Sequence, residues 1–195
     1  MSHPLSKRAA IFGGSFDPVH RGHRGMVRHA MEAVELDRVL FMPACVSPFK
    51  SGTVASGPQR ATMLELALND EELDDVEIST FEIDRNQPSY SWETATHFCS
   101  AFPRTEWYWI LGSDQWNSID RWAEPGKLRE LLRFVIMTRN EDPVMDRPGW
   151  NYLAVPYSHP ASSSAIRKDF QSHLSWMSPS VVAFCQREGL YQADS

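Results

Sequence analysis

The sequence lacks the features that mark membrane, secreted and disulfide-rich proteins. No apolar stretch approaches the roughly 18 residues that a membrane-spanning helix needs, and the polar first residues do not resemble a secretory signal. Only three cysteines occur, far apart and without a C-x-x-C pair, so neither a disulfide framework nor a zinc motif is indicated. We therefore expect a cytoplasmic protein whose thiols are free and buried.

An excess of positive charge is also missing. Lysine and arginine number 19 against 25 aspartates and glutamates, for a net charge of −6. Because a broad nucleic-acid surface needs a basic excess, we expect no nucleic-acid partner, and no membrane partner either. The 195 residues, 42% of them hydrophobic, suit one globular domain spanning 1–195.

Short apolar segments alternate with segments of helical periodicity along the whole chain. Strands are expected at 9–12, 38–42, 76–83, 107–111, 134–137 and 153–155. Helices are expected from near residue 23, at 60–68, 92–101 and 127–132, and from residues 164 and 179. This alternation predicts an α/β fold: a Rossmann-like, open, mostly parallel twisted sheet with helices on both faces and a small C-terminal helical segment. Ligands of such sheets bind beyond the carboxyl ends of the strands.

The run GGSFDPVHRGH, from Gly13 to His23, follows the first expected strand. Glycines let the backbone approach a ligand closely, and the first amides of a helix attract anions. His20 and His23 could donate hydrogen bonds or positive charge to phosphate oxygens there. The Walker A and dinucleotide motifs do not fit, because the lysine of the first and the third glycine of the second are missing. A zinc site of Asp17, His20 and His23 is a weaker alternative, since the interposed proline and glycine suit a phosphate turn better.

This run resembles the H-x-G-H signature of the nucleotidyltransferase superfamily, and its longer form resembles that of the nicotinate-nucleotide adenylyltransferases. Three more segments match motifs of that family in order: residues 89–94 its S-Y-T-x-x-T, residues 110–114 its I-x-G-x-D, and residues 161–167 its I-S-S-T-x-I-R. A P-H-K triplet is matched by Pro48-Phe49-Lys50, where phenylalanine replaces the histidine. The resemblance covers nearly the whole chain.

The resemblance implies an enzyme that transfers AMP from ATP to nicotinate mononucleotide, with Mg²⁺ held mainly by the ATP phosphates and by no protein ligand. The residues expected to be catalytic are His20, His23 and Arg167. The residues expected at the ATP site are Gly13, Gly14, Ser15, Phe16, His20, His23, Gly112, Asp114, Ser162, Ser163, Ile166 and Arg167. Those expected at the mononucleotide site are Ser15, Lys50, Tyr90, Ser91 and Trp122.

Several alternatives stay open at this point. The acceptor could instead be nicotinamide mononucleotide or another phosphorylated compound, and the unmatched Phe49 admits a nucleotide-binding protein without turnover. Trp122 could be a core residue and Asp114 a helix cap. Arg139 is a further candidate for the pyridine pocket, or a surface arginine. The sequence leaves open the oligomeric state and whether the loop over residues 44–58 closes over substrates.

Overall fold

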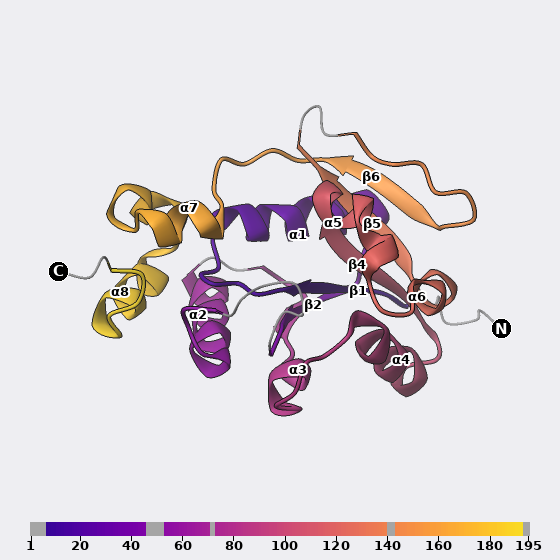
Figure 1. Ribbon diagram of the computed structural model, residues 1–195, viewed down its shortest axis with the longest axis horizontal. Helices are drawn as coiled ribbons and strands as arrows, with labels where there is room; N and C mark the ends of the chain where they lie inside the picture. The colour runs from indigo at the N-terminus through magenta and orange to yellow at the C-terminus, as the bar shows by residue number, and fades with distance from the viewer. Residues whose placement is uncertain (1–6, 46–52, 71–72, 140–142, 193–195) are drawn as a thin grey trace.

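The computed structural model describes residues 7–45, 53–70, 73–139 and 143–192 (Figure 1). Its strands are β1 (Lys7–Gly14), β2 (Arg38–Pro43), β3 (Val76–Ile78), β4 (Thr105–Gly112), β5 (Arg133–Thr138) and β6 (Tyr152–Pro156). Its α-helices are α1 (Arg21–Val34), α2 (Gly57–Asp70), α3 (Phe81–Asp84), α4 (Ser91–Ala101), α5 (Ser113–Asn117), α6 (Pro125–Leu131), α7 (Ser163–Lys168) and α8 (Pro179–Arg187). Two 3₁₀ helices join them, η1 (Ile119–Arg121) and η2 (Gln171–Trp176). None of the described helices is long and apolar enough to cross a membrane.

The six strands form one sheet in the order β3-β2-β1-β4-β5-β6. Every described strand pair is parallel; Ala9, for example, lies beside Arg38 of β2 and Trp107 of β4. The strand order reverses between β1 and β4, which is where a doubly wound sheet opens a crevice for ligands. The predicted Rossmann-like α/β fold is therefore confirmed.

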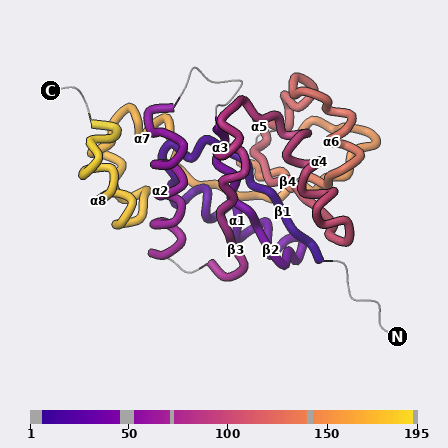
Figure 2. The backbone as a smooth tube through the Cα atoms, turned by 90° about the horizontal axis from the view of Figure 1, so that it is seen from below, coloured from indigo at the N-terminus to yellow at the C-terminus, as the bar shows by residue number. Residues whose placement is uncertain are grey.

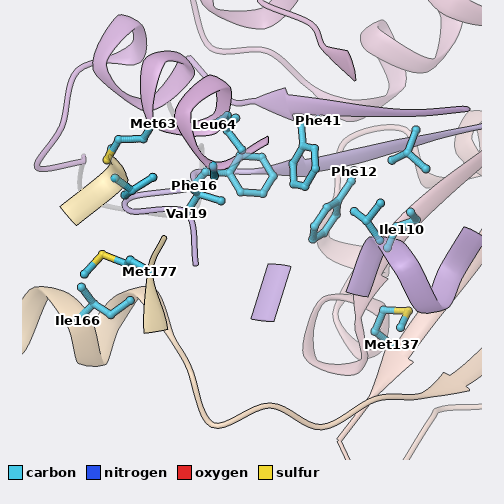
Figure 3. Packing of buried hydrophobic residues seen from close by; sticks show 14 of the residues in the cluster. Phe12, Phe16, Val19, Phe41, Met63, Leu64, Ile110, Met137, Ile166 and Met177 are labelled. Atoms are coloured by element: carbon cyan, nitrogen blue, oxygen red, sulfur yellow. The ribbon is translucent and has the colours of Figure 1, made fainter. Parts of the chain in front are cut away.

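Side chains that alternate along the strands build a hydrophobic core on each face of the sheet. Ala10 and Phe12 of β1 pack in a cluster with residues of α1, α2 and α8, whereas Ala9 and Ile11 pack in a cluster with residues of α4, α5 and α6. Because helices cover both faces of the sheet, the strands are continuous apolar runs in the sequence. Figure 3 shows part of the first cluster, with Phe16 beside Phe41 and Phe12.

The C-terminal helices form a group of their own. In Figures 1 and 2, α7 and α8 lie beside α2 at one end of the molecule, and α4 and α6 lie together at the opposite end. The predicted C-terminal helical segment is thus present, and α8 begins at Pro179 and is followed by Gly189, whose φ of +67° suits glycine.

Two predicted elements were wrong in extent. The strand expected at 76–83 ends at Ile78, because Phe81 turns away to stack on His97 of α4 (ring centroids 4.2 Å apart), and a short helix begins there. The helix expected from residue 164 through the apolar positions 166, 170 and 174 stops at Lys168. Its periodicity continues only as η2, because Asp169 is extended (φ −148°) and its carboxylate accepts the N–H of Ser172.

Candidate functional site

A cleft of about 620 Å³ opens at the carboxyl ends of β1 and β4, where the strand order reverses. Segments far apart in the sequence line it: the β1–α1 loop, the start of α4, the β4–α5 turn, the end of β5 and the segment before α7. The expected site residues that line it are Gly13, Gly14, Ser15, Phe16, His20, His23, Tyr90, Ser91, Gly112, Asp114, Trp122 and Ser163. The fold thus brings most of the sequence-predicted site residues around one cavity.

The two glycines at the end of β1 are required by close packing. A Cβ at Gly13 would lie 2.9 Å from the ring of Trp109, and a Cβ at Gly14 would lie 2.9 Å from the ring of Phe16. The Phe16 ring is 1% exposed, and its backbone adopts a left-handed φ of 50°. The loop therefore folds back over its own aromatic side chain, and this holds the backbone of Ser15 at the cleft.

The two histidines of the H-x-G-H run lock each other in place. His20 is the N-cap of α1, and its N–H donates to Nδ1 of His23 (3.2 Å), while the two rings stack with centroids 3.7 Å apart. Neutral His23 must then carry its proton on Nε2, which makes that atom the hydrogen-bond donor of the ring. A Cβ at Gly22 would lie 3.0 Å from the His20 ring, so the glycine between the histidines makes room for the stack.

His20 is held in its uncharged form. Its side chain is only 7% exposed, and its Nδ1 has no hydrogen-bond partner within the described part of the chain. Burial, together with the nearby His159 and Arg139, lowers the pKa of His20 to about 3. At neutral pH His20 can therefore offer a ligand an N–H donor but no positive charge. The sequence analysis left both options open, a hydrogen-bond donor or a positive charge, and for His20 the donor remains.

Asp17 has a structural role. Its carboxylate accepts the N–H of Val54 (2.9 Å), the N–H of Ala55 (3.0 Å) and the hydroxyl of Tyr191 (2.6 Å). Burial and the Asp17 carboxylate raise the pKa of the Tyr191 phenol, so the hydroxyl stays protonated and donates. These bonds tie the β1–α1 loop to the segment before α2 and to the segment after α8, and they account for Asp17 without a metal ion.

Arg60 also holds the β1–α1 loop in place. Its side chain is fully buried and donates to the carbonyl oxygens of Ser15 (2.7 Å), Ala44 (2.6 Å), Cys45 (3.1 Å) and Ala55 (3.3 Å). The sequence analysis placed Arg60 only at the start of the helix expected at 60–68 and missed this role. The signal was available, because Arg60 shares an apolar helix face with Met63, Leu64 and Ala67 at the spacing i, i+3, i+4, i+7, where a charged side chain must find buried acceptors.

The start of α7 packs directly against the β1–α1 loop. Ser162 caps the helix by accepting the N–H of Ala165 (3.2 Å), and Ser163 Oγ donates to the carbonyl of Pro18 (2.9 Å). The guanidinium of Arg167 donates to the carbonyl of Asp17 and lies 4.0 Å from its carboxylate. Arg167 is therefore on the same side of the molecule as the two histidines, beside the residues that line the cleft rather than among them. The side chain of Ile166 is fully buried in the core, so only its backbone could reach a ligand.

Three of the residues expected to hold the mononucleotide, Tyr90, Ser91 and Trp122, line the cleft together with Ser15 of the β1–α1 loop. Tyr90 is the N-cap of α4 and donates its N–H to Glu93 (3.2 Å), and Ser91 begins the helix. Trp122 is half-buried and meets Trp109 edge to face, with ring centroids 6.3 Å apart. Lys50 and the neighbouring Phe49 lie outside the described residues.

The turn after β4 resolves one alternative from the sequence. Gly112 is the N-cap of α5 and Asp114 lies in the first turn, so Asp114 is not the cap. A Cβ at Gly112 would lie 2.6 Å from Oδ1 of Asp114, so the glycine leaves space for this exposed carboxylate.

Three more polar residues line the cleft. Arg139, for which the sequence left a pocket position and a surface position open, lines it just after the end of β5. The sequence analysis did not single out the other two. Glu82 is 5% exposed and accepts the hydroxyl of Thr94 (2.7 Å), and burial raises its pKa. His159 lines the cleft from the segment before α7, and only the folded chain brings it there.

The fold and the cleft together define a ligand-binding protein of the doubly wound α/β class. The chain belongs to the cytidylyltransferase-like family, whose model matches residues 11–169, and within it to the nicotinate-nucleotide adenylyltransferases. A relative from Caldicellulosiruptor saccharolyticus named "Probable nicotinate-nucleotide adenylyltransferase" is 30% identical over 95% of this chain and 99% of its own length. One of the same name from Methylacidiphilum infernorum is 40% identical over 69% of this chain and 66% of its own length. The structure of Plasmodium falciparum nicotinic acid mononucleotide adenylyltransferase complexed with NaAD shares the fold, with a TM-score of 0.81 over 95% of this chain and 97% of that one at 20% identity.

Proposed function

We propose that this protein is an adenylyltransferase that joins ATP and nicotinate mononucleotide to give nicotinate adenine dinucleotide and pyrophosphate, a step of NAD synthesis. The observation that carries the proposal is the cleft itself: the two stacked histidines at the start of α1 line the same cavity as Tyr90 and Ser91 at the start of α4 and Trp122 after η1. Its curated relatives that match over two thirds or more of both chains carry the name of that activity.

The reaction can proceed without a covalent bond between the protein and a substrate. A 5′-phosphate oxygen of the mononucleotide, already anionic, attacks the α-phosphorus of ATP. The bond from that phosphorus to the oxygen bridging to the β-phosphorus breaks, and pyrophosphate leaves with the electron pair. No protein nucleophile or general base is needed, so catalysis rests on positioning two anions and on stabilising the charge that builds on the leaving group.

The geometry suggests how the work is divided. Nε2–H of His23 and a ring N–H of neutral His20 would donate to the α-phosphate and its neighbours. The capped start of α7, with Ser163 and Arg167, would hold the outer phosphates. Asp114 and Gly112 would receive the adenosine.

The acceptor would occupy the remaining wall of the cleft. Tyr90, Ser91 and Trp122 would surround the pyridine ring of the acceptor. Ser15, at the end of β1, would hold the phosphate of the acceptor together with Lys50.

Mg²⁺ fits this site only as a partner of the nucleotide. Within the described ranges, no group of three or more His, Cys, Asp or Glu side chains could hold a metal ion, and the carboxylate of Asp17 is taken up by structural bonds. We therefore propose that phosphate oxygens and water supply most of its ligands, as is common for Mg²⁺. The bound ion would neutralise phosphate charge. We propose a cytoplasmic location from the sequence. Of the three cysteines expected to be buried, Cys185 is buried, whereas Cys45 and Cys99 are half-buried.

The test is an assay of pyrophosphate release with purified protein, ATP and Mg²⁺, in which nicotinate mononucleotide and nicotinamide mononucleotide are compared side by side. We expect turnover with both substrates present, none with ATP alone, and a higher kcat/KM for the nicotinate form. Preference for the nicotinamide form would overturn the substrate assignment. ATP binding without turnover on either acceptor would overturn the proposed activity.

A further inference from the structure

We infer that His159 is a third imidazole of the cleft, positioned to donate a hydrogen bond to the outer phosphates of ATP. The inference rests on the proposed function and extends it, because neither the H-x-G-H run nor the serine-rich segment before Arg167 includes this residue.

The position of His159 brings it against the start of α1. It lies on the segment between the end of β6 and Ser163, and it lines the cleft together with His20 and Gly22. Its Nδ1 lies 3.4 Å from the point where a Cβ at Gly22 would sit, so its ring rests directly on the first turn of α1. The first amides of a helix lack intrahelical partners there, and this is where an anion is attracted.

The ring of His159 is oriented before any ligand arrives. Its Nδ1 accepts the N–H of Ala161 (3.1 Å), so the neutral ring carries its proton on Nε2 and that atom is a donor. On its other side the ring lies nearly parallel to Tyr157, with centroids 6.4 Å apart. Tyr157 in turn occupies the space that a side chain at position 25 would need. Gly22 and Gly25 lie three residues apart on one face of α1. Because neither has a side chain, the rings of His159 and Tyr157 can pack against the helix backbone there.

The nearby charges and the course of the chain indicate that His159 would contact the outer phosphates of ATP rather than its adenosine. His159 lies three residues before Ser162, the cap of α7, and both His159 and Ser163, the first residue of that helix, line the cleft. Arg139 at the end of β5 lines the same cavity and is close enough to His20 to affect its pKa. Burial and the charge of Arg21 lower the pKa of His159, which favours the neutral donor form.

Two substitutions separate the donor from the structural contact. In His159→Asn the amide oxygen can replace Nδ1 as acceptor for Ala161, but no donor remains at the position of Nε2. In His159→Gln the amide N–H reaches that position. We expect His159→Asn to raise the KM for ATP roughly tenfold or more, the scale for losing a hydrogen bond to a charged group. His159→Gln should recover most of the loss, and the KM for the mononucleotide should stay within about twofold in both.

His29→Asn is the matched control. His29 also contacts Tyr157, with ring centroids 4.7 Å apart, but it is exposed and does not line the cleft. If His29→Asn raised the KM for ATP as much as His159→Asn does, the effect would come from the packing of Tyr157, and a direct phosphate contact would be refuted. Equal rises of both KM values in His159→Asn would refute it as well.

A binding measurement keeps this inference separate from the proposed activity. Calorimetry with inorganic tripolyphosphate and with AMP needs no turnover. His159→Asn should weaken the binding of tripolyphosphate by a similar factor and leave AMP unchanged. If the wild type bound tripolyphosphate but released no pyrophosphate, the proposed function would fail while this inference stood. If the variant bound tripolyphosphate as well as the wild type does, the inference would fail whatever the activity.

Discussion

The buried, uncharged His20 should make the protein lose stability in mild acid. In the unfolded chain this imidazole is protonated below its ordinary pKa of 6.5, whereas in the folded protein burial holds the pKa near 3. Between these two values the unfolded state binds the extra proton, so the free energy of unfolding falls as the pH falls. The contribution of His20 is fully present above pH 6.5 and is lost progressively toward pH 3.

The size of the effect follows from the two pKa values. Each pH unit between them costs about 1.4 kcal/mol once the unfolded imidazole is fully protonated. Integrated from about pH 7.5 to about pH 5, the loss attributable to His20 is about 2 kcal/mol. His20 is only 7% exposed, and its Nδ1 has no hydrogen-bond partner among the described residues. Solvent screening should therefore reduce this loss of unfolding free energy only slightly.

The measurement compares the wild type with His20→Asn by urea unfolding at several pH values. Asparagine does not titrate and is a favourable N-cap, so α1 can still begin at Arg21. All other ionisable groups are common to the two proteins, so their contributions cancel in the difference. The variant should lose about 2 kcal/mol less than the wild type between about pH 7.5 and about pH 5. Parallel profiles for the wild type and His20→Asn would refute the claim that the fold keeps this ring neutral.

The other expectations concern the phosphate and acceptor contacts and the support of the loop. His23→Ala should lower kcat on the order of a hundredfold, the scale for losing one preorganised donor; unchanged turnover would rule out its role. Arg167→Ala should impair the use of ATP more than that of the mononucleotide in steady-state kinetics, and normal ATP kinetics would count against the assignment. Lys50→Ala should raise the KM for the mononucleotide more than the KM for ATP, and the reverse order would mean that the two half-sites are exchanged. Tyr191→Phe should cost about 1–3 kcal/mol of unfolding free energy by removing the 2.6 Å bond to Asp17; denaturant unfolding measures this, and a loss near zero would show that the bond contributes nothing.

The fold could be predicted because each strand carries its own signal. The run at residues 9–12 is apolar on both faces and ends in glycine, and the periodicity of Val27, Ala30 and Val34 predicts the helix that follows. What failed was decided by contacts across the chain. Phe81 leaves the sheet to stack on His97, and no pattern within residues 76–83 records that partner.

The candidate site divides in the same way. Motif residues such as Gly13 and Gly112 come together because parallel strands end at one edge of the sheet, which sequence order already implies. Arg60 binds the carbonyl of Ser15, 45 residues away, and His159 reaches the cleft only through the folded course of the chain. Both placements therefore depend on tertiary structure, and the roles of all these residues in catalysis stay predictions for the assays above.

The bond between Tyr191 and Asp17 joins two residues that lie 174 positions apart in the sequence. The β1–α1 loop keeps this anchor only while the segment after α8 stays packed against it. Local unfolding of that segment would release Asp17, so hydrogen exchange in the loop should speed up whenever exchange after α8 does.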